Sequence, residues 1–141
     1  MRNFSFWIVW AQVMGIILAL FGISMCLIAL SGYDLAYINN AFRQTIPNMN
    51  QVKDFQQWIY GVYGAVAVPF GILMFSLARY GLRNREKWAW NCLMISICSW
   101  VIIDTYFSVS FKVYANSVNN IILFVLLCLP LLMVRKQING R

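Results

Sequence analysis

The 141-residue sequence contains no histidine and only four acidic residues, against eleven lysines and arginines. It therefore lacks the commonest metal ligand, which is also the side chain best suited to proton transfer near neutral pH. The four cysteines include no CxxC pair, which argues against a thiol oxidase, and there is no glycine-rich phosphate loop. We expect no metal, no cofactor and no catalytic residues.

What the sequence does contain is long apolar stretches. Three of them, 6–30, 58–78 and 88–109, satisfy the requirement of about 20 apolar residues for a hydrocarbon core of about 30 Å. A fourth run, 121–134, is too short, so its helix must begin near Ala115 and the span becomes 115–134. The sequence thus predicts an all-α fold, a single transmembrane domain formed by an integral membrane four-helix bundle. The first apolar run exceeds the roughly 7–15 residues of a signal sequence, so we expect it to be retained as a helix.

The distribution of basic residues predicts the orientation. Segments of a membrane protein that stay in the cytoplasm are enriched in lysine and arginine near the ends of the spans. Three basic residues, Arg43, Lys53 and Lys112, fall on one side, and eight fall on the other: Arg2, Arg79, Arg83, Arg85, Lys87, Arg135, Lys136 and Arg141. Both termini are therefore predicted to be cytoplasmic, in the cell inner (plasma) membrane. The net charge of +7 then reflects topology, and we expect no nucleic-acid partner.

The connections between the spans differ in character. The inner turn carries Arg79, Arg83, Arg85 and Lys87, which can contact anionic lipid head groups. The outer loop, 31–57, is the longest connection and contains a possible short interfacial helix starting at Asp34. The bilayer is thus one expected partner of the chain.

Small residues form stripes on the first two spans. Gly15, Ala19 and Gly22 recur along one face of the first, and Gly64 and Gly71 along the second. Such stripes let helix backbones approach closely in a membrane. The sequence does not determine whether they pair within one chain or across a homodimer.

Prolines and tryptophans mark two further features of the spans. Pro69 and Pro130 each leave one helical carbonyl without its usual partner, which neighbouring helices can tolerate. Trp10 and Trp90 fall near the cytoplasmic boundary, where amphipathic rings gather in an aromatic belt.

Asp104 is the only acidic residue in any span. It lies 16 residues after Trp88, which corresponds to about 24 Å along the helix axis and places it near the outer leaflet. Counting equal lengths along the other helices brings four polar side chains to that depth, and i+4 spacing puts two more residues on the face of Asp104. The predicted ligand-binding set is therefore Asp104, Trp100, Ser108, Asn119, Asn120, Tyr60 and Tyr63.

An acid inside a span usually faces protein and is paired. Asp104 could simply fix helix register through a hydrogen bond to Asn119, Asn120 or a tyrosine hydroxyl, or it could bind a ligand or a proton. We expect a non-catalytic binding or assembly module that takes a lipid-like or small amphipathic ligand, or a membrane protein partner. The first alternative is a proton-coupled small-molecule transporter acting as a homodimer. The second is a small membrane enzyme, which would need a tyrosine or Lys112 beside Asp104.

One stretch of the sequence carries a family resemblance. The basic turn from Ala78 to Arg83, the segment Glu86-Lys87-Trp88-Ala89-Trp90, then Trp100 and the Asp104-Thr105 pair follow one another within residues 78–105. This stretch resembles small uncharacterised four-span bacterial inner-membrane proteins. The resemblance implies the same topology and no particular activity. Small multidrug-resistance transporters match in size, but their membrane carboxylate belongs to the first helix, which is uncharged here.

Overall fold

The computed structural model describes residues 2–35 and 52–139. Within this part of the chain there are four long helices: α1 (Arg2–Ser31), α3 (Lys53–Ser76), α4 (Lys87–Ser110) and α5 (Tyr114–Asn139). A short π-helix, η2 (Leu77–Leu82), continues α3 without a break. All four are long and apolar enough to cross a membrane, so the prediction of an all-helical, multi-pass membrane protein is confirmed. The predicted interfacial helix of the outer loop falls on 36–51, outside the described residues.

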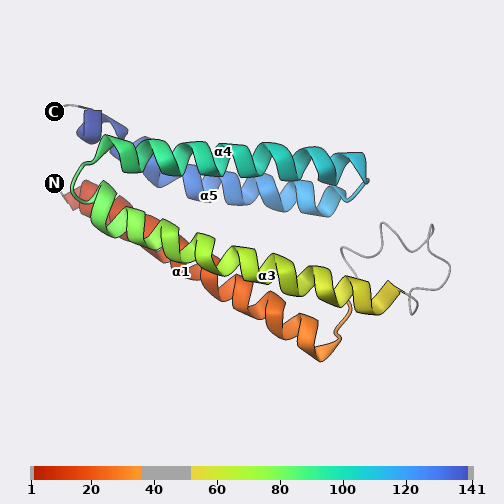
Figure 1. The fold of residues 1–141 in the computed structure, drawn as a ribbon. Helices are drawn as coiled ribbons and strands as arrows, with labels where there is room; N and C mark the ends of the chain where they lie inside the picture. Colours follow the sequence, from red (N-terminus) through yellow and green to blue (C-terminus); the bar gives the residue numbers. More distant parts are fainter. Residues whose placement is uncertain (1, 36–51, 140–141) are drawn as a thin grey trace.

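The helices run up and down, so their ends gather at two poles (Figure 1). The start of α1, the turn between η2 and α4, and the end of α5 lie together, and we call this pole the terminus end. The end of α1, the start of α3 and the turn between α4 and α5 lie at the opposite pole, the loop end. The start of α1 and the end of α5 therefore lie at the same pole.

α1 and α3 pack backbone against backbone along their small-residue stripes. A Cβ placed on Gly22 would lie 2.8 Å from the carbonyl oxygen of Gly64, and one on Gly15 would lie 2.8 Å from that of Gly71. No larger side chain fits between helices this close. The two stripes therefore pair within one chain, the question that the sequence left open.

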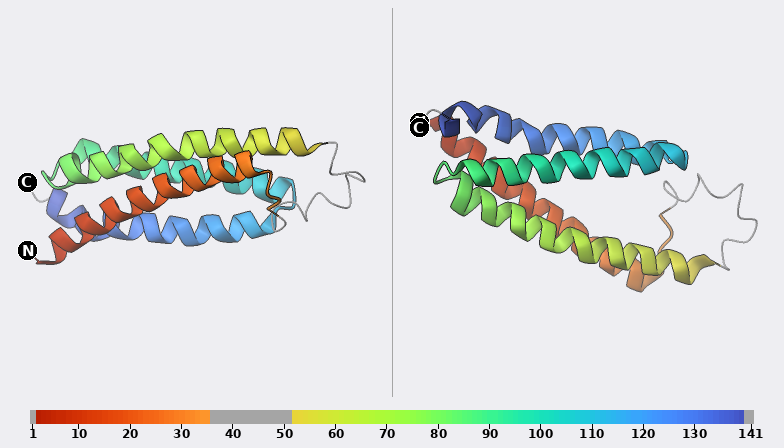
Figure 2. Two further views of the ribbon diagram at one scale, coloured as in Figure 1. Left: turned by 90° about the horizontal axis from the view of Figure 1, so that it is seen from below. Right: turned by 45° about the horizontal axis from the view of Figure 1, so that its top comes forward.

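The apolar core joins all four helices only toward the terminus end. Its buried side chains include Ile8 of α1, Met74 of α3, Leu93 of α4 and Leu131 of α5. From this shared region, the α1–α3 pair and the α4–α5 pair diverge toward the loop end (Figure 1; Figure 2, right). α1 contacts α5, whereas α3 itself packs chiefly on α1 and reaches α4 through η2. The fold is thus two helical hairpins joined at one end.

Two tryptophan indoles donate hydrogen bonds to the backbone of α5 at this junction. Pro130 has no N–H to donate to the carbonyl of Leu126, one turn earlier. The indole Nε1–H of Trp10 donates to that carbonyl at 3.1 Å, so α1 supplies the missing bond. The indole of Trp90 donates to the carbonyl of Leu131 at 2.8 Å. Both rings, expected in an interfacial belt, are part-buried and bind helix backbone.

Both tight turns are closed by a basic residue with positive φ. Lys112 has φ 61° after α4, and Arg85 has φ 60° after η2. At the α4–α5 turn, Val113 N donates to Ser108 O at 2.8 Å and Lys112 N donates to Val109 O at 3.0 Å, which is the pattern of a Schellman cap. These caps set the short antiparallel connections on either side of α4.

Candidate functional site: a polar cluster in the α4–α5 hairpin

The buried row of α4 changes from apolar to polar toward the loop end. Leu93 and Ile97 are buried in the shared core, and helical spacing continues their row through Asp104 to Ser108. Leu131 of α5 is likewise buried in this core, and its row continues toward the loop end through apolar Leu127 and Phe124 to Asn120 and Asn116. Where the hairpins diverge, core positions are thus filled by polar side chains.

These side chains form a hydrogen-bonded cluster with Asp104 at its centre. Asn116 Nδ2 donates to Asp104 Oδ1 at 3.0 Å and to Ser108 Oγ at 2.8 Å. Ser108 Oγ donates to the carbonyl oxygen of Asp104 at 2.7 Å and lies 3.3 Å from its Oδ1. One turn deeper, Asn120 Nδ2 donates to Thr105 Oγ1 at 3.2 Å. We call Asp104, Ser108 and Asn116 the carboxylate cluster.

One oxygen of the carboxylate is left open. Oδ2 of Asp104 accepts no hydrogen bond from the residues that the structure describes. It is not enclosed either, because Ser117 Oγ is the one fully buried side-chain polar atom without a partner in that part of the chain. The donors of Asn116 and Ser108 thus hold the carboxyl group by one oxygen and present the other.

The structure brings together only part of the predicted set. Ser108, 6% exposed, lies in the carboxylate cluster with Asp104, and Asn120, 2% exposed, lies one turn away. Trp100 packs against the shared core. Asn119 is exposed on another face of α5.

The two predicted tyrosines belong to the other hairpin. Tyr60 is buried on α3, and Tyr63 is exposed there, with its ring edge-to-face against Phe21 of α1 at a centroid distance of 6.0 Å. Since α3 diverges from α4 and α5 toward this end, equal depth did not mean contact.

Asn116 is the partner that the sequence reasoning missed. α5 begins at Tyr114, close to the predicted start near Ala115, so Asn116 lies in its first turn. The depth count led instead to Asn119 and Asn120. A usable signal existed, because Ser108 and Asn116 lie four residues before and four residues after Lys112, the centre of the turn. Residues equally spaced about a tight antiparallel turn face one another.

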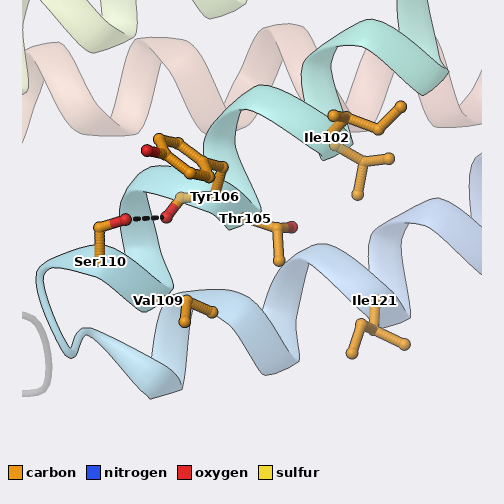
Figure 3. Close-up of a pocket in the computed structure, with 7 residues that line it drawn as sticks. Ile102, Thr105, Tyr106, Val109, Ser110 and Ile121 are labelled. Atoms are coloured by element: carbon orange, nitrogen blue, oxygen red, sulfur yellow. Dashed lines mark hydrogen bonds between the residues drawn. The ribbon is translucent and has the colours of Figure 1, made fainter.

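An open groove runs along the flank of α4 beside the cluster (Figure 3). It has a volume of about 570 Å³, and its lining is mainly apolar, with Ile102 and Val109 on α4 and Ile121 on α5. Thr105, which accepts the hydrogen bond of Asn120, also lines it. Asp104 does not line this groove, because consecutive helical residues point about 100° apart. The groove is thus separate from the carboxylate cluster.

The basic residues at the terminus end lie over aromatic rings. The guanidinium of Arg85 is 5.1 Å from the centroid of Phe4, and that of Arg135 is 5.4 Å from Trp90. Arg79 is 5.8 Å from the ring of Tyr80. Arg85 is half-buried, and Arg79, Arg83, Lys87 and Arg135 are exposed at this pole. Cations spaced in this way can meet anionic head groups.

Among the described residues there is no group of three histidine, cysteine, aspartate or glutamate side chains that could hold a metal ion. No family model matches the chain, and comparisons with curated proteins and with solved structures found no match.

Proposed function

We propose that the protein lies in the cell inner membrane with both termini in the cytoplasm. The support is the charge difference between its poles. Among the described residues, the segments at the terminus end contribute seven lysines and arginines, and those at the loop end contribute two. Basic residues near the ends of spans are retained on the cytoplasmic side. The loop end, with the carboxylate cluster, then faces the outer leaflet.

The proposed role is the non-catalytic binding of a lipid-like or small amphipathic molecule at the carboxylate cluster. The observation that carries it is the open Oδ2 of Asp104 on the core-facing row of α4, where the two hairpins part. A carboxylate inside an apolar span is costly unless it is paired. Asn116 and Ser108 satisfy one oxygen only, so the other is left for a molecule that enters from the outer leaflet.

A transporter remains the second candidate, because the same oxygen can take up a proton. The hairpins are joined at the terminus end and diverge at the loop end, where the carboxylate cluster lies. A chain of four helices would need a second copy to enclose a path. We propose no catalytic step, since Asn116 and Ser108, the hydrogen-bond partners of Asp104, supply neither an acid nor a base.

The test is native mass spectrometry of the protein extracted in a mild detergent. Wild type should appear as a monomer that retains a discrete small molecule, and the isosteric variant Asp104→Asn should lose it. Asn119→Ala is the matched control, because Asn119 lies on α5 but is exposed outside the cluster. An empty dimer would favour the transporter, and an empty monomer would contradict binding.

The orientation is tested separately. Reporter fusions to the C-terminus that are active only in the cytoplasm should be active, and fusions that need the outer compartment should be silent. The opposite pattern would place the carboxylate cluster in the inner leaflet and overturn this part of the proposal.

A further inference from the structure

The hydrogen-bonding capacity of the carboxylate cluster identifies the chemical class of its ligand. Each donor in the cluster can be assigned from the contacts. Ser108 has a single hydroxyl proton, which is used on the carbonyl or the Oδ1 of Asp104. The amide nitrogen of Asn116 donates to Asp104 Oδ1 and to Ser108 Oγ, which uses both of its protons. Every side-chain donor of the cluster therefore already makes its hydrogen bonds within the cluster.

The acceptors are not consumed. Oδ2 of Asp104 accepts no hydrogen bond from the described residues, and neither does the amide oxygen of Asn116. Neither atom is enclosed, since Ser117 Oγ is the one fully buried unpaired side-chain atom in that part of the chain. The amide cannot be turned over, because its oxygen would then face the carboxylate oxygen. The open side of the cluster thus presents two acceptors, one of them on an acid.

The neighbouring charges do not neutralise this acid. Lys112, the nearest basic residue along the chain, is exposed in the α4–α5 turn, and no ion pair joins it to Asp104 within the described residues. A ligand that brings a positive charge and N–H donors would complete the cluster. Charge-assisted hydrogen bonds of this kind are about twice as strong as neutral ones.

We infer that the carboxylate cluster binds the protonated amine of a cationic amphiphile, with the ammonium directed to Asp104 Oδ2 and the apolar tail in the outer leaflet. This inference rests on the proposed binding function and adds the charge and the donor character of the head group. An anionic head group would meet two acceptors, one of them the carboxylate, and a neutral one would leave the acid without a counter-charge.

The experiment compares four probes that share one tail and differ in the head group. Protein in dodecyl maltoside is titrated at neutral pH with dodecylamine, dodecyltrimethylammonium, dodecanol and dodecanoate, and binding is followed by tryptophan fluorescence. Dodecylamine should bind at least about tenfold more tightly than dodecanol, the difference expected for a charge-assisted hydrogen bond. Dodecyltrimethylammonium, which has the charge without N–H groups, should fall between them, and dodecanoate should bind least.

The variants separate this inference from the proposed function. Asp104→Asn should remove the preference for the amine, and Asn119→Ala should keep it. Equal, Asp104-dependent binding of dodecanol and dodecylamine would overturn the inference and leave the binding function in place. Preference for dodecanoate would also overturn it. Absence of any Asp104-dependent binding, together with an empty native mass spectrum, would overturn both.

Discussion

Replacing Gly71 by alanine tests the close pairing of α1 and α3. A Cβ at this position would lie 2.5 Å from the backbone nitrogen of Ala19 and 2.5 Å from the carbonyl oxygen of Gly15. Ordinary contact begins at 3.4 Å, and the obstructing atoms are backbone, so no side chain can turn aside. The two helices must therefore move apart by several tenths of an ångström along the stripe.

The expected cost follows from two opposing effects. Overpacking of a tight interface costs about 1–3 kcal/mol, whereas glycine to alanine in a helix gains about 0.5–1 kcal/mol. Gly61→Ala is the matched control on the same helix, because its Cβ would lie 3.6 Å from the Cβ of Ala29, an ordinary contact. The propensity gain is common to both variants, so Gly71→Ala should be less stable than Gly61→Ala by about 1–3 kcal/mol.

The assay is reversible unfolding in mixed micelles by titration with a denaturing detergent, followed by helical circular dichroism. Equal stability of the two variants would refute the backbone contact between the stripes. A difference that grows with protein concentration would refute the pairing of the stripes within one chain, because it would show that they join two copies.

Three further predictions concern other parts of the fold. Trp10→Phe should destabilise the protein by about 1 kcal/mol through loss of the hydrogen bond to Leu126 O. In a Pro130→Ala background, where residue 130 regains its N–H, the same change should cost less. An equal cost in both backgrounds would contradict the role of the indole. Lys112→Gly should raise the free energy of unfolding by up to about 1 kcal/mol, because φ is 61° there and glycine adopts positive φ without strain. Arg85→Gly should gain less stability, since it also loses the contact with Phe4. Thermal unfolding in detergent measures both variants, and a loss of stability in Lys112→Gly would contradict the prediction. Asn116→Ala should lower the free energy of unfolding by about 1–3 kcal/mol, because Asp104 Oδ1 loses its amide donor. Asn119→Ala should leave it unchanged. The reverse ranking in the same unfolding assay would show that Asn119 is the true partner of Asp104.

The helices themselves were predictable because membrane thickness fixes their length. Three of the predicted spans each lie within one observed helix, and the second, 58–78, lies within α3 and η2, which together cover residues 53–82. The small-residue stripes were also visible as a pattern. Their pairing was not, because spacing on one helix shows which face packs but not which helix packs on it.

The candidate site was predictable only in part. Asp104 and Ser108 could be identified, since one acid in a span and i+4 spacing on α4 are properties of a single helix. The partner of Asp104 depends on how two helices are joined, and depth counted from the far ends of the spans selected Asn119 in place of Asn116. The depth of a residue in the membrane also could not show that the hairpins diverge. Because they diverge, Tyr63 packs against Phe21 within its own hairpin. Lateral arrangement in a membrane is set by packing, and hydropathy carries little of that information.

The most direct test of the carboxylate cluster is nuclear magnetic resonance of the asparagine side-chain amides, with the protein in lipid bicelles. The Asn116 amide protons should be shifted downfield and exchange slowly, and Asp104→Ala should abolish both effects. The Asn119 amide should be the same in both proteins. Addition of dodecylamine should shift the Asp104 carboxyl carbon and leave the Asn116 amide in place. An Asn116 amide that matches Asn119 and ignores the Asp104 substitution would contradict the account.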